Sequence, residues 1–187
     1  MPGSIVLISG PPGAGKTTVA RLLVDSSPSP VAYVEGDTFW HFIVKSEGVA
    51  PKAKVRMHNA RIVMQAMMAT AVRFARGGYE TVLDFTIGPW FLQYLPPTMQ
   101  DVPFDYVILC PSEAVCAARA GARGEGQMPD YAPYRELHAA FSAPGAFERH
   151  AIRSDTADAA ELAAQIRAGL ATGTYRVDPA TFVGANR

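Results

Sequence analysis

Residues 10–17 read Gly-Pro-Pro-Gly-Ala-Gly-Lys-Thr, which matches the phosphate-binding pattern G-x-x-x-x-G-K-[ST] in full. Glycines in such a loop allow backbone angles that point several N–H groups at one anion. We expect Lys16 to reach the β- and γ-phosphates of a nucleotide and the Thr17 hydroxyl to hold Mg²⁺. The expected cofactors are therefore ATP and Mg²⁺, although the motif does not distinguish ATP from GTP. The predicted nucleotide-binding residues of this segment are Gly10, Pro11, Pro12, Gly13, Ala14, Gly15, Lys16, Thr17 and Thr18.

Two acidic residues lie where predicted strands end. Asp84 closes the apolar run 82–84, and Asp37 comes just after the predicted strand 31–35. We expect Asp84 to be a second residue that binds Mg²⁺ beside Thr17, either directly or through a water molecule. We expect Asp37 to accept the proton of an acceptor hydroxyl as it attacks the γ-phosphate. Either carboxylate could instead cap the segment that follows it, and for Asp37 the two roles are compatible.

A third group of candidate residues is the segment Arg119-Ala-Gly-Ala-Arg123-Gly-Glu-Gly. Arg119 and Arg123 are four residues apart and would share one face of a helix. A glycine-bearing loop follows them, which is typical of a lid. We predict a lid over about 119–134 whose arginines neutralise charge on the transferring phosphate, with Arg119 also binding the nucleotide. The alternative is two solvated arginines near a helix end.

The elements that must position these residues alternate along the chain. Apolar runs predict strands, and segments with helical spacing lie between them. Such βαβ units predict an α/β fold of three layers, with a five-stranded parallel sheet and helices on both faces. The predicted strands are 5–9, 31–35, 81–84, 104–110 and 151–154. The predicted helices are 16–24, about 38–45, 52–76, 89–94, 112–122, 134–142 and 158–171, and the tail after Gly173 is expected to be irregular.

A phosphate loop predicts nucleotide binding but not the reaction. The sequence contains no N/T-K-x-D motif, which a GTP switch would need, and no L-S-G-G-Q-like segment, which an ABC-type ATPase would need. A ring ATPase normally needs more chain for its helical lid. The small-molecule kinases remain, in which a hydroxyl is the acceptor. The alternative that we leave open is a nucleotide-binding regulatory module, or an ATPase without transfer.

The segments 10–18, 36–37 and 119–123 and the strand that ends at Asp84 together resemble the P-loop small-molecule kinases. This group is related to the nucleoside monophosphate kinases. It includes gluconate kinase, shikimate kinase, chloramphenicol phosphotransferase and the zeta-toxin-like kinases. The resemblance covers about residues 4–172. It implies the strand order 2-3-1-4-5 and places residues 154–156 near the adenine.

The acceptor side of the predicted site is less specific. Residues 39–42, Phe-Trp-His-Phe, cannot all be buried on one face of a single helical turn, so some of them line a pocket or an edge. We expect the segment 38–76 to cover the acceptor, and Arg56, with Asn59 and Arg61 nearby, to be a candidate for holding an anionic acceptor. The residues after Asp37 differ from those of gluconate kinases, so the resemblance assigns no particular acceptor. A toxin-like or antibiotic-resistance kinase would use the same chemistry.

Composition limits the partners. The chain has 17 lysines and arginines and 17 aspartates and glutamates, so its net charge is zero. Non-specific binding to nucleic acid, which needs a basic excess, is therefore not expected. No run of 18 apolar residues predicts a membrane span, and the N-terminus does not read as a signal peptide. We therefore expect a cytoplasmic protein with a single domain over 1–187 and a small-molecule acceptor. Cys110 and Cys116 are expected to be buried structural residues. The sequence does not indicate an oligomeric state.

Overall fold

The computed structural model describes residues 3–122, 128–178 and 181–182 of the 187-residue chain. Its centre is a parallel sheet in the order β2-β3-β1-β4-β5, as the resemblance implied. Every residue of β1 is buried, which is why its sequence is a continuous apolar run. The strands are β1 (Ile5–Ser9), β2 (Val31–Glu35), β3 (Glu80–Asp84), β4 (Phe104–Leu109), β5 (Ala151–Ile152) and β6 (Arg176–Val177).

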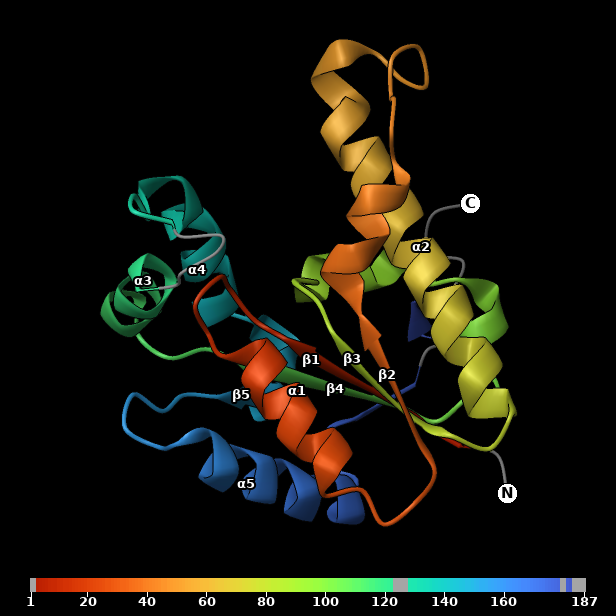
Figure 1. Cartoon of the computed structure of the whole chain (residues 1–187), viewed down its shortest axis with the longest axis vertical. Coiled ribbons are helices and arrows are strands. Elements are labelled where there is room, and N and C mark those ends of the chain that lie inside the picture. Colours follow the sequence, from red (N-terminus) through yellow and green to blue (C-terminus); the bar gives the residue numbers. More distant parts are fainter. Residues whose placement is uncertain (1–2, 123–127, 179–180, 183–187) are drawn as a thin grey trace.

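Helices cover both faces of the sheet (Figure 1). α1 (Lys16–Asp25) and α5 (Ala159–Thr172) pack together on one face, and α2 (Val55–Arg76) lies on the other. α3 (Glu113–Gly121) and α4 (Arg135–Ser142) lie side by side at one end of the sheet, joined by an ion pair of 3.0 Å between Arg135 and Glu113. The fold is therefore the predicted three-layer α/β arrangement.

The structure corrects two predicted helices. Residues 38–45 were expected to form a helix, but the structure has a 3₁₀ helix, Gly36–Phe42, that ends before Ile43. The long helix expected from Lys52 begins as a 3₁₀ turn, Lys52–Lys54, and becomes α-helical only at Val55. Short 3₁₀ stretches are common where an α-helix starts or where a connection turns. The remaining 3₁₀ helices are Pro89–Tyr94, Pro97–Met99, Ala132–Tyr134 and Gly145–His150.

The tail is the third correction. The sequence predicted an irregular segment after Gly173, but Arg176–Val177 pairs antiparallel with β4. Val177 is buried, and Arg176 forms an ion pair of 3.0 Å with the buried carboxylate of Asp105. A strand of two residues is too short to show an alternating pattern, so the sequence could not reveal it.

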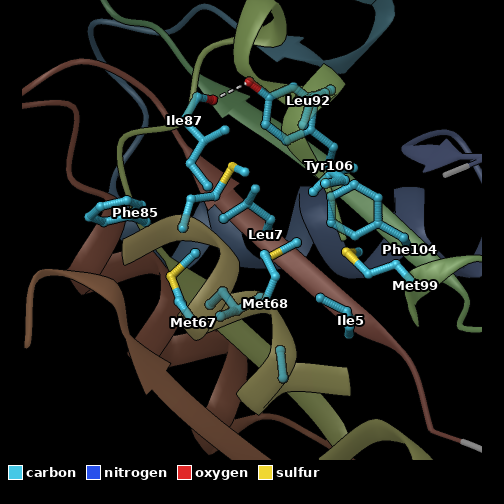
Figure 2. Packing of buried hydrophobic residues seen from close by; sticks show 14 of the residues in the cluster. Ile5, Leu7, Met67, Met68, Phe85, Ile87, Leu92, Met99, Phe104 and Tyr106 are labelled. Atoms are coloured by element: carbon cyan, nitrogen blue, oxygen red, sulfur yellow. Dashed lines mark hydrogen bonds between the residues drawn. The ribbon is translucent and has the colours of Figure 1, made fainter. Parts of the chain in front are cut away.

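The core divides into two clusters, one on each face of the sheet. Figure 2 shows part of the cluster beneath α2, where Met67 and Met68 pack toward Leu7 of β1. Cys110 and Cys116 are free and buried, as predicted. Burial raises the pKa of Cys116 to about 11, so its thiol is not activated. Within the described residues, no helix combines the length and apolar character that crossing a membrane requires.

His150 lies buried beside β4 as a neutral ring. Its Nδ1 donates to the carbonyl oxygen of Tyr106 at 2.8 Å, and its Nε2 accepts a hydrogen bond from Nε of Arg149 at 3.1 Å. Burial lowers the pKa of His150 below its usual value of 6.5. Protonation would place a second N–H against the Arg149 donor, so the folded state resists it.

We expect His150 to make the free energy of unfolding depend on pH. Below about pH 6.5 the unfolded chain binds a proton at His150 before the folded chain does, so stability is present above this pH and falls as the pH is lowered. Urea unfolding of the wild type and of His150→Gln between pH 8 and pH 5 measures how the free energy of unfolding of each protein depends on pH. The stability advantage of the wild type should shrink toward pH 5. An advantage that stays constant would contradict the assignment.

Candidate active site

The phosphate loop connects β1 to α1 and is packed tightly from two sides. Gly13 has φ +79°, and a Cβ built on it would lie 2.1 Å from the carbonyl oxygen of Cys116 in α3. A Cβ on Gly10, where φ is +144°, would lie 2.1 Å from the carbonyl oxygen of Leu109. Both positions therefore need glycine for conformation and for space. The loop is thus held against β4 and α3 in one shape.

Lys16 opens α1, and its side chain lies along the loop. Its Nζ donates to the carbonyl oxygen of Pro11 at 3.1 Å. Thr17 and Thr18 follow in the first turn of α1, Thr17 partly buried and Thr18 exposed. Ammonium and hydroxyl groups at the start of a helix, beside its positive dipole end, are the arrangement that binds phosphate and its metal.

Two residues of the predicted lid segment lie beside the phosphate loop. Nη1 of Arg119 lies 3.9 Å from the position that a Cβ on Gly15 would take. The hydroxyl of Tyr131 donates to the carbonyl oxygen of Pro12 at 2.9 Å. Arg119 is exposed and stands in the last turn of α3. Arg123, its predicted partner, lies outside the described residues.

Asp84 ends β3 and lies opposite Ile8 of β1, just before the phosphate loop. Its side chain is 5% exposed, and within the described part of the chain its Oδ1 has no hydrogen-bond partner. Burial and the nearby Asp84 charge raise the pKa of Tyr33. A buried carboxylate oxygen without a donor is costly unless a cation or water approaches it. The oxygens of Thr17 and Asp84 therefore fit Mg²⁺, which prefers oxygen ligands.

A cavity of about 630 Å³ opens beside the phosphate loop. Lys16 and Asp37 both line it, so the structure brings together the predicted phosphate-binding lysine and the predicted base. Arg56, at the start of α2, lines it as well. The other lining residues are Pro12, Trp40, Met57, Ala60, Phe85, Thr86, Ile87, Gly88, Trp90, Phe91, Met128, Tyr134 and Leu137.

The floor of this cavity is fixed to the sheet by buried hydrogen bonds. The Ser9 hydroxyl donates to the carbonyl oxygen of Ile87 at 2.7 Å and accepts from its N–H at 2.9 Å. The hydroxyl of Tyr106 donates to the same carbonyl oxygen at 2.5 Å, and Figure 2 shows this bond. Residues 85–88 are therefore anchored to both β1 and β4.

A family model described as an AAA domain matches residues 5–144, which contain the phosphate loop and all the described residues that line the cavity. The chain belongs to this AAA-domain family. No curated protein sequence matches the chain significantly.

The AAA domain has the fold of the P-loop kinases. A sugar kinase from Janibacter sp. HTCC2649 covers 91% of this chain and 95% of its own length, with a TM-score of 0.61 and 19% identity. The tunicamycin resistance protein of Deinococcus radiodurans covers 90% and 95%, with a TM-score of 0.68 and 18% identity. The APS kinase of Mycobacterium tuberculosis, solved with AMPPNP and APS, covers 90% and 98%, with a TM-score of 0.64 and 17% identity. At these identities the shared feature is the fold.

The aromatic residues after Asp37 divide between core, cavity and surface. Phe39 packs against the core cluster, Trp40 lines the cavity, and His41 and Phe42 are exposed. Phe42 is 73% exposed and meets Phe39 edge to face at 5.7 Å between ring centroids. The sequence argument that these four residues could not share one environment is confirmed.

Of the three polar residues expected on α2, only Arg56 lines the cavity among the described residues. Arg61 instead stacks on the ring of Tyr94, with its Cζ 3.9 Å from the ring centroid, and donates to the Tyr94 hydroxyl at 2.5 Å. Asn59 is partly buried outside the cavity lining. The five positions from Arg56 to Arg61 carry the helix past one full turn but short of two. The two side chains therefore point in different directions.

The sequence interpretation did not assign the segment 85–91 to the site. This segment supplies six of the described cavity residues: Phe85, Thr86, Ile87 and Gly88, followed by Trp90 and Phe91 of the 3₁₀ helix Pro89–Tyr94. It treated 85–88 only as the connection after Asp84 and 89–94 only as a short helix. The available signal was its place directly after a strand, because ligands of parallel sheets bind outside the carboxyl ends of strands.

Gly36 makes room for the cavity floor. A Cβ on Gly36 would lie 2.5 Å from the ring of Phe85, which is buried beneath the cavity. We expect Gly36→Ala to push this ring aside and to destabilise the protein by about 1–3 kcal/mol, as overpacking does. Urea unfolding measures the loss. Gly121→Ala is the control, because the nearest atom of the described residues to its Cβ, the carbonyl oxygen of Met128, is 3.9 Å away. Equal stability of the two variants would contradict this packing.

A second cavity, of about 540 Å³, lies at the ends of β4 and β5. Residues 154–156, which the resemblance places near the adenine, line it together with Ser112 and His138. The N–H of Ser112 donates to Oδ1 of Asp155 at 2.7 Å, and this bond lowers the pKa of Asp155. His138 is buried with its Nε2 2.9 Å from the carbonyl oxygen of Pro111. This cavity is a candidate for the base of the nucleotide.

Proposed function

We propose that the protein is an ATP-dependent phosphotransferase that moves the γ-phosphate to a hydroxyl group of a small molecule. The observation that carries this proposal is the single cavity lined by both Lys16 of the phosphate loop and Asp37 of the next strand end. A phosphate anchor and a carboxylate in one space are what phosphoryl transfer to an alcohol requires. The zero net charge favours a small-molecule acceptor over nucleic acid.

In the proposed reaction, Asp37 accepts the proton of the acceptor hydroxyl as its oxygen attacks the γ-phosphorus. The bond from that phosphorus to the bridging oxygen breaks, and ADP leaves with the electron pair. Lys16 and the N–H groups of the loop stabilise the charge on the phosphate oxygens. Arg119, beside Gly15, adds positive charge from the lid side, and Arg123 is proposed as a second lid arginine from the sequence alone.

A metal ion and the nucleobase of ATP complete the proposed nucleotide site. Thr17 and Asp84 would hold Mg²⁺, which would neutralise the β- and γ-phosphates when bound. Within the described residues no cluster of three or more His, Cys, Asp or Glu could hold a metal ion, so we expect the ion to bind together with the nucleotide. The nucleobase of ATP would occupy the second cavity, at residues 154–156. The APS kinase neighbour, solved with AMPPNP and APS, supports a nucleotide as donor.

A thermal-shift screen tests the proposal. The ligands are Mg-ATP, Mg-GTP and a panel of sugar acids, nucleosides, nucleoside monophosphates and hydroxylated antibiotics. A ligand at 100 times its dissociation constant stabilises a protein by about 2.7 kcal/mol, which raises the melting temperature measurably. We expect a shift with ATP and a further shift with one acceptor class. Nucleotide binding without any acceptor effect or turnover would favour the regulatory module or the plain ATPase.

A further inference from the structure

The wall of the larger cavity is mostly apolar. Of the described lining residues, the polar ones besides Lys16 and Asp37 are Arg56, Thr86 and Tyr134, and each of the two tryptophans adds one indole N–H. Arg56 is exposed at the start of α2. The apolar and aromatic wall comprises Pro12, Trp40, Met57, Ala60, Phe85, Ile87, Trp90, Phe91, Met128 and Leu137.

The backbone of the cavity floor offers little further polar recognition. The N–H of Ile87 donates to the Ser9 hydroxyl, and its carbonyl oxygen accepts from both Ser9 and Tyr106. The carbonyl oxygen of Gly88 accepts from the N–H of Phe91 at 2.8 Å. The N–H of Ile87 and both lone pairs of its carbonyl oxygen are therefore occupied within the protein, and one of the two lone pairs of the Gly88 carbonyl oxygen is occupied as well.

This distribution separates two kinds of acceptor. A sugar acid carries several hydroxyls, and each one that is buried against rings and methyl groups loses water without gaining a partner. A molecule with an apolar ring body gains from the same burial. Lys16 and Asp37 are sufficient for its one reacting hydroxyl and the phosphate that meets it. The cavity volume of about 630 Å³ lies in the range of drug-sized ligands.

We propose that the acceptor is an apolar alcohol that carries a ring system, with the ring body against Trp40, Trp90 and Phe85 and its hydroxyl at Asp37. This inference rests on the proposed phosphotransferase function, because it assigns the substrate class of the same site.

The two tryptophans make the test direct. The sequence contains two tryptophans, Trp40 and Trp90, and both line the cavity, so tryptophan emission reports on its occupancy. The probes are 1-adamantanemethanol, borneol and 2-cyclohexylethanol, which are saturated ring alcohols that do not absorb at the excitation wavelength. Gluconate and ribose are the polar probes. All are titrated with Mg-ADP present, so that the nucleotide site is filled without turnover.

We expect at least one ring alcohol to shift the tryptophan emission saturably and to bind at least tenfold more tightly than gluconate or ribose. Trp40→Ala should weaken this binding by about tenfold, since an aromatic contact of this size is worth roughly 1.4 kcal/mol. Phe42→Ala is the matched control, because Phe42 belongs to the same 3₁₀ helix but is 73% exposed outside the cavity lining. It should bind the probe as the wild type does.

Failure of this inference and failure of the proposed function give different results. Tighter binding of gluconate or ribose, or no emission change with any ring alcohol, overturns the apolar acceptor even if ATP is turned over. Equal effects of Trp40→Ala and Phe42→Ala overturn it as well. Ring-alcohol binding with the expected Trp40 effect supports the cavity assignment, and a failure to transfer labelled phosphate to any bound probe would then count against the phosphotransferase function.

Discussion

The Lys16→Ala variant is expected to lose at least about 10²–10³-fold in phosphate transfer, because it removes a positive charge from the phosphates where negative charge develops. Lys16 lines the cavity, and its ammonium group already lies along the phosphate loop, 3.1 Å from the carbonyl oxygen of Pro11. Transfer of labelled γ-phosphate at saturating ATP measures the effect.

Lys45→Ala is the control for this change. It removes the same charge from an exposed position outside the cavity lining, so it should retain wild-type transfer. Circular dichroism and thermal unfolding should find Lys16→Ala folded, since the hydrogen bond from Lys16 to Pro11 lies within the loop itself and joins no separate elements of the fold. Near-normal transfer by folded Lys16→Ala would exclude the proposed role of the phosphate loop.

Asp37→Asn is expected to bind ATP as the wild type does and to transfer phosphate roughly 10²–10⁴-fold more slowly, because an amide cannot accept the acceptor proton. Asp37 is exposed and lines the cavity with Lys16, so the substitution keeps the shape of the site. Isothermal titration with ATP and a single-turnover transfer assay separate binding from chemistry.

Glu47→Gln is the matched control for Asp37→Asn, because it removes one carboxylate charge from an exposed loop position outside the cavity lining. It should change neither measurement. If Asp37→Asn weakened the affinity for Mg-ATP but not for ATP without metal, Asp37 would be a metal-binding residue and not the proton acceptor. Unchanged transfer by Asp37→Asn would remove it from the chemistry.

The phosphate loop and the strand end at Asp84 could be placed from the sequence because their signals are local. The loop 10–17 needs its glycines and its lysine at fixed spacing, and Asp84 directly follows the two apolar residues Val82 and Leu83 of a buried strand. Strand and helix order then placed these residues at one edge of the sheet. The structure adds that Oδ1 of Asp84 is buried without a hydrogen-bond partner among the described residues.

The acceptor half could be predicted only in part, because its wall is assembled from distant segments. Trp40, Trp90 and Leu137 meet in space but are separated by 50 and 47 positions in the sequence. In the sequence, these apolar side chains cannot be told from core residues. Only the fold shows that they line an open cavity. The bonds from Ser9 to Ile87, which fix the cavity floor, span 78 residues and leave no local pattern.

The most direct test of the central claim is transfer of labelled γ-phosphate from ATP into a small-molecule extract of cells. The account predicts that the wild type forms a discrete labelled product and that Asp37→Asn does not form it, although both bind Mg-ATP. Phosphatase treatment should release the label as inorganic phosphate, as expected for an alcohol ester. Release of inorganic phosphate alone, at equal rates from both proteins, would identify an ATPase and contradict the account. Tight nucleotide binding without any turnover would contradict it in favour of a regulatory module.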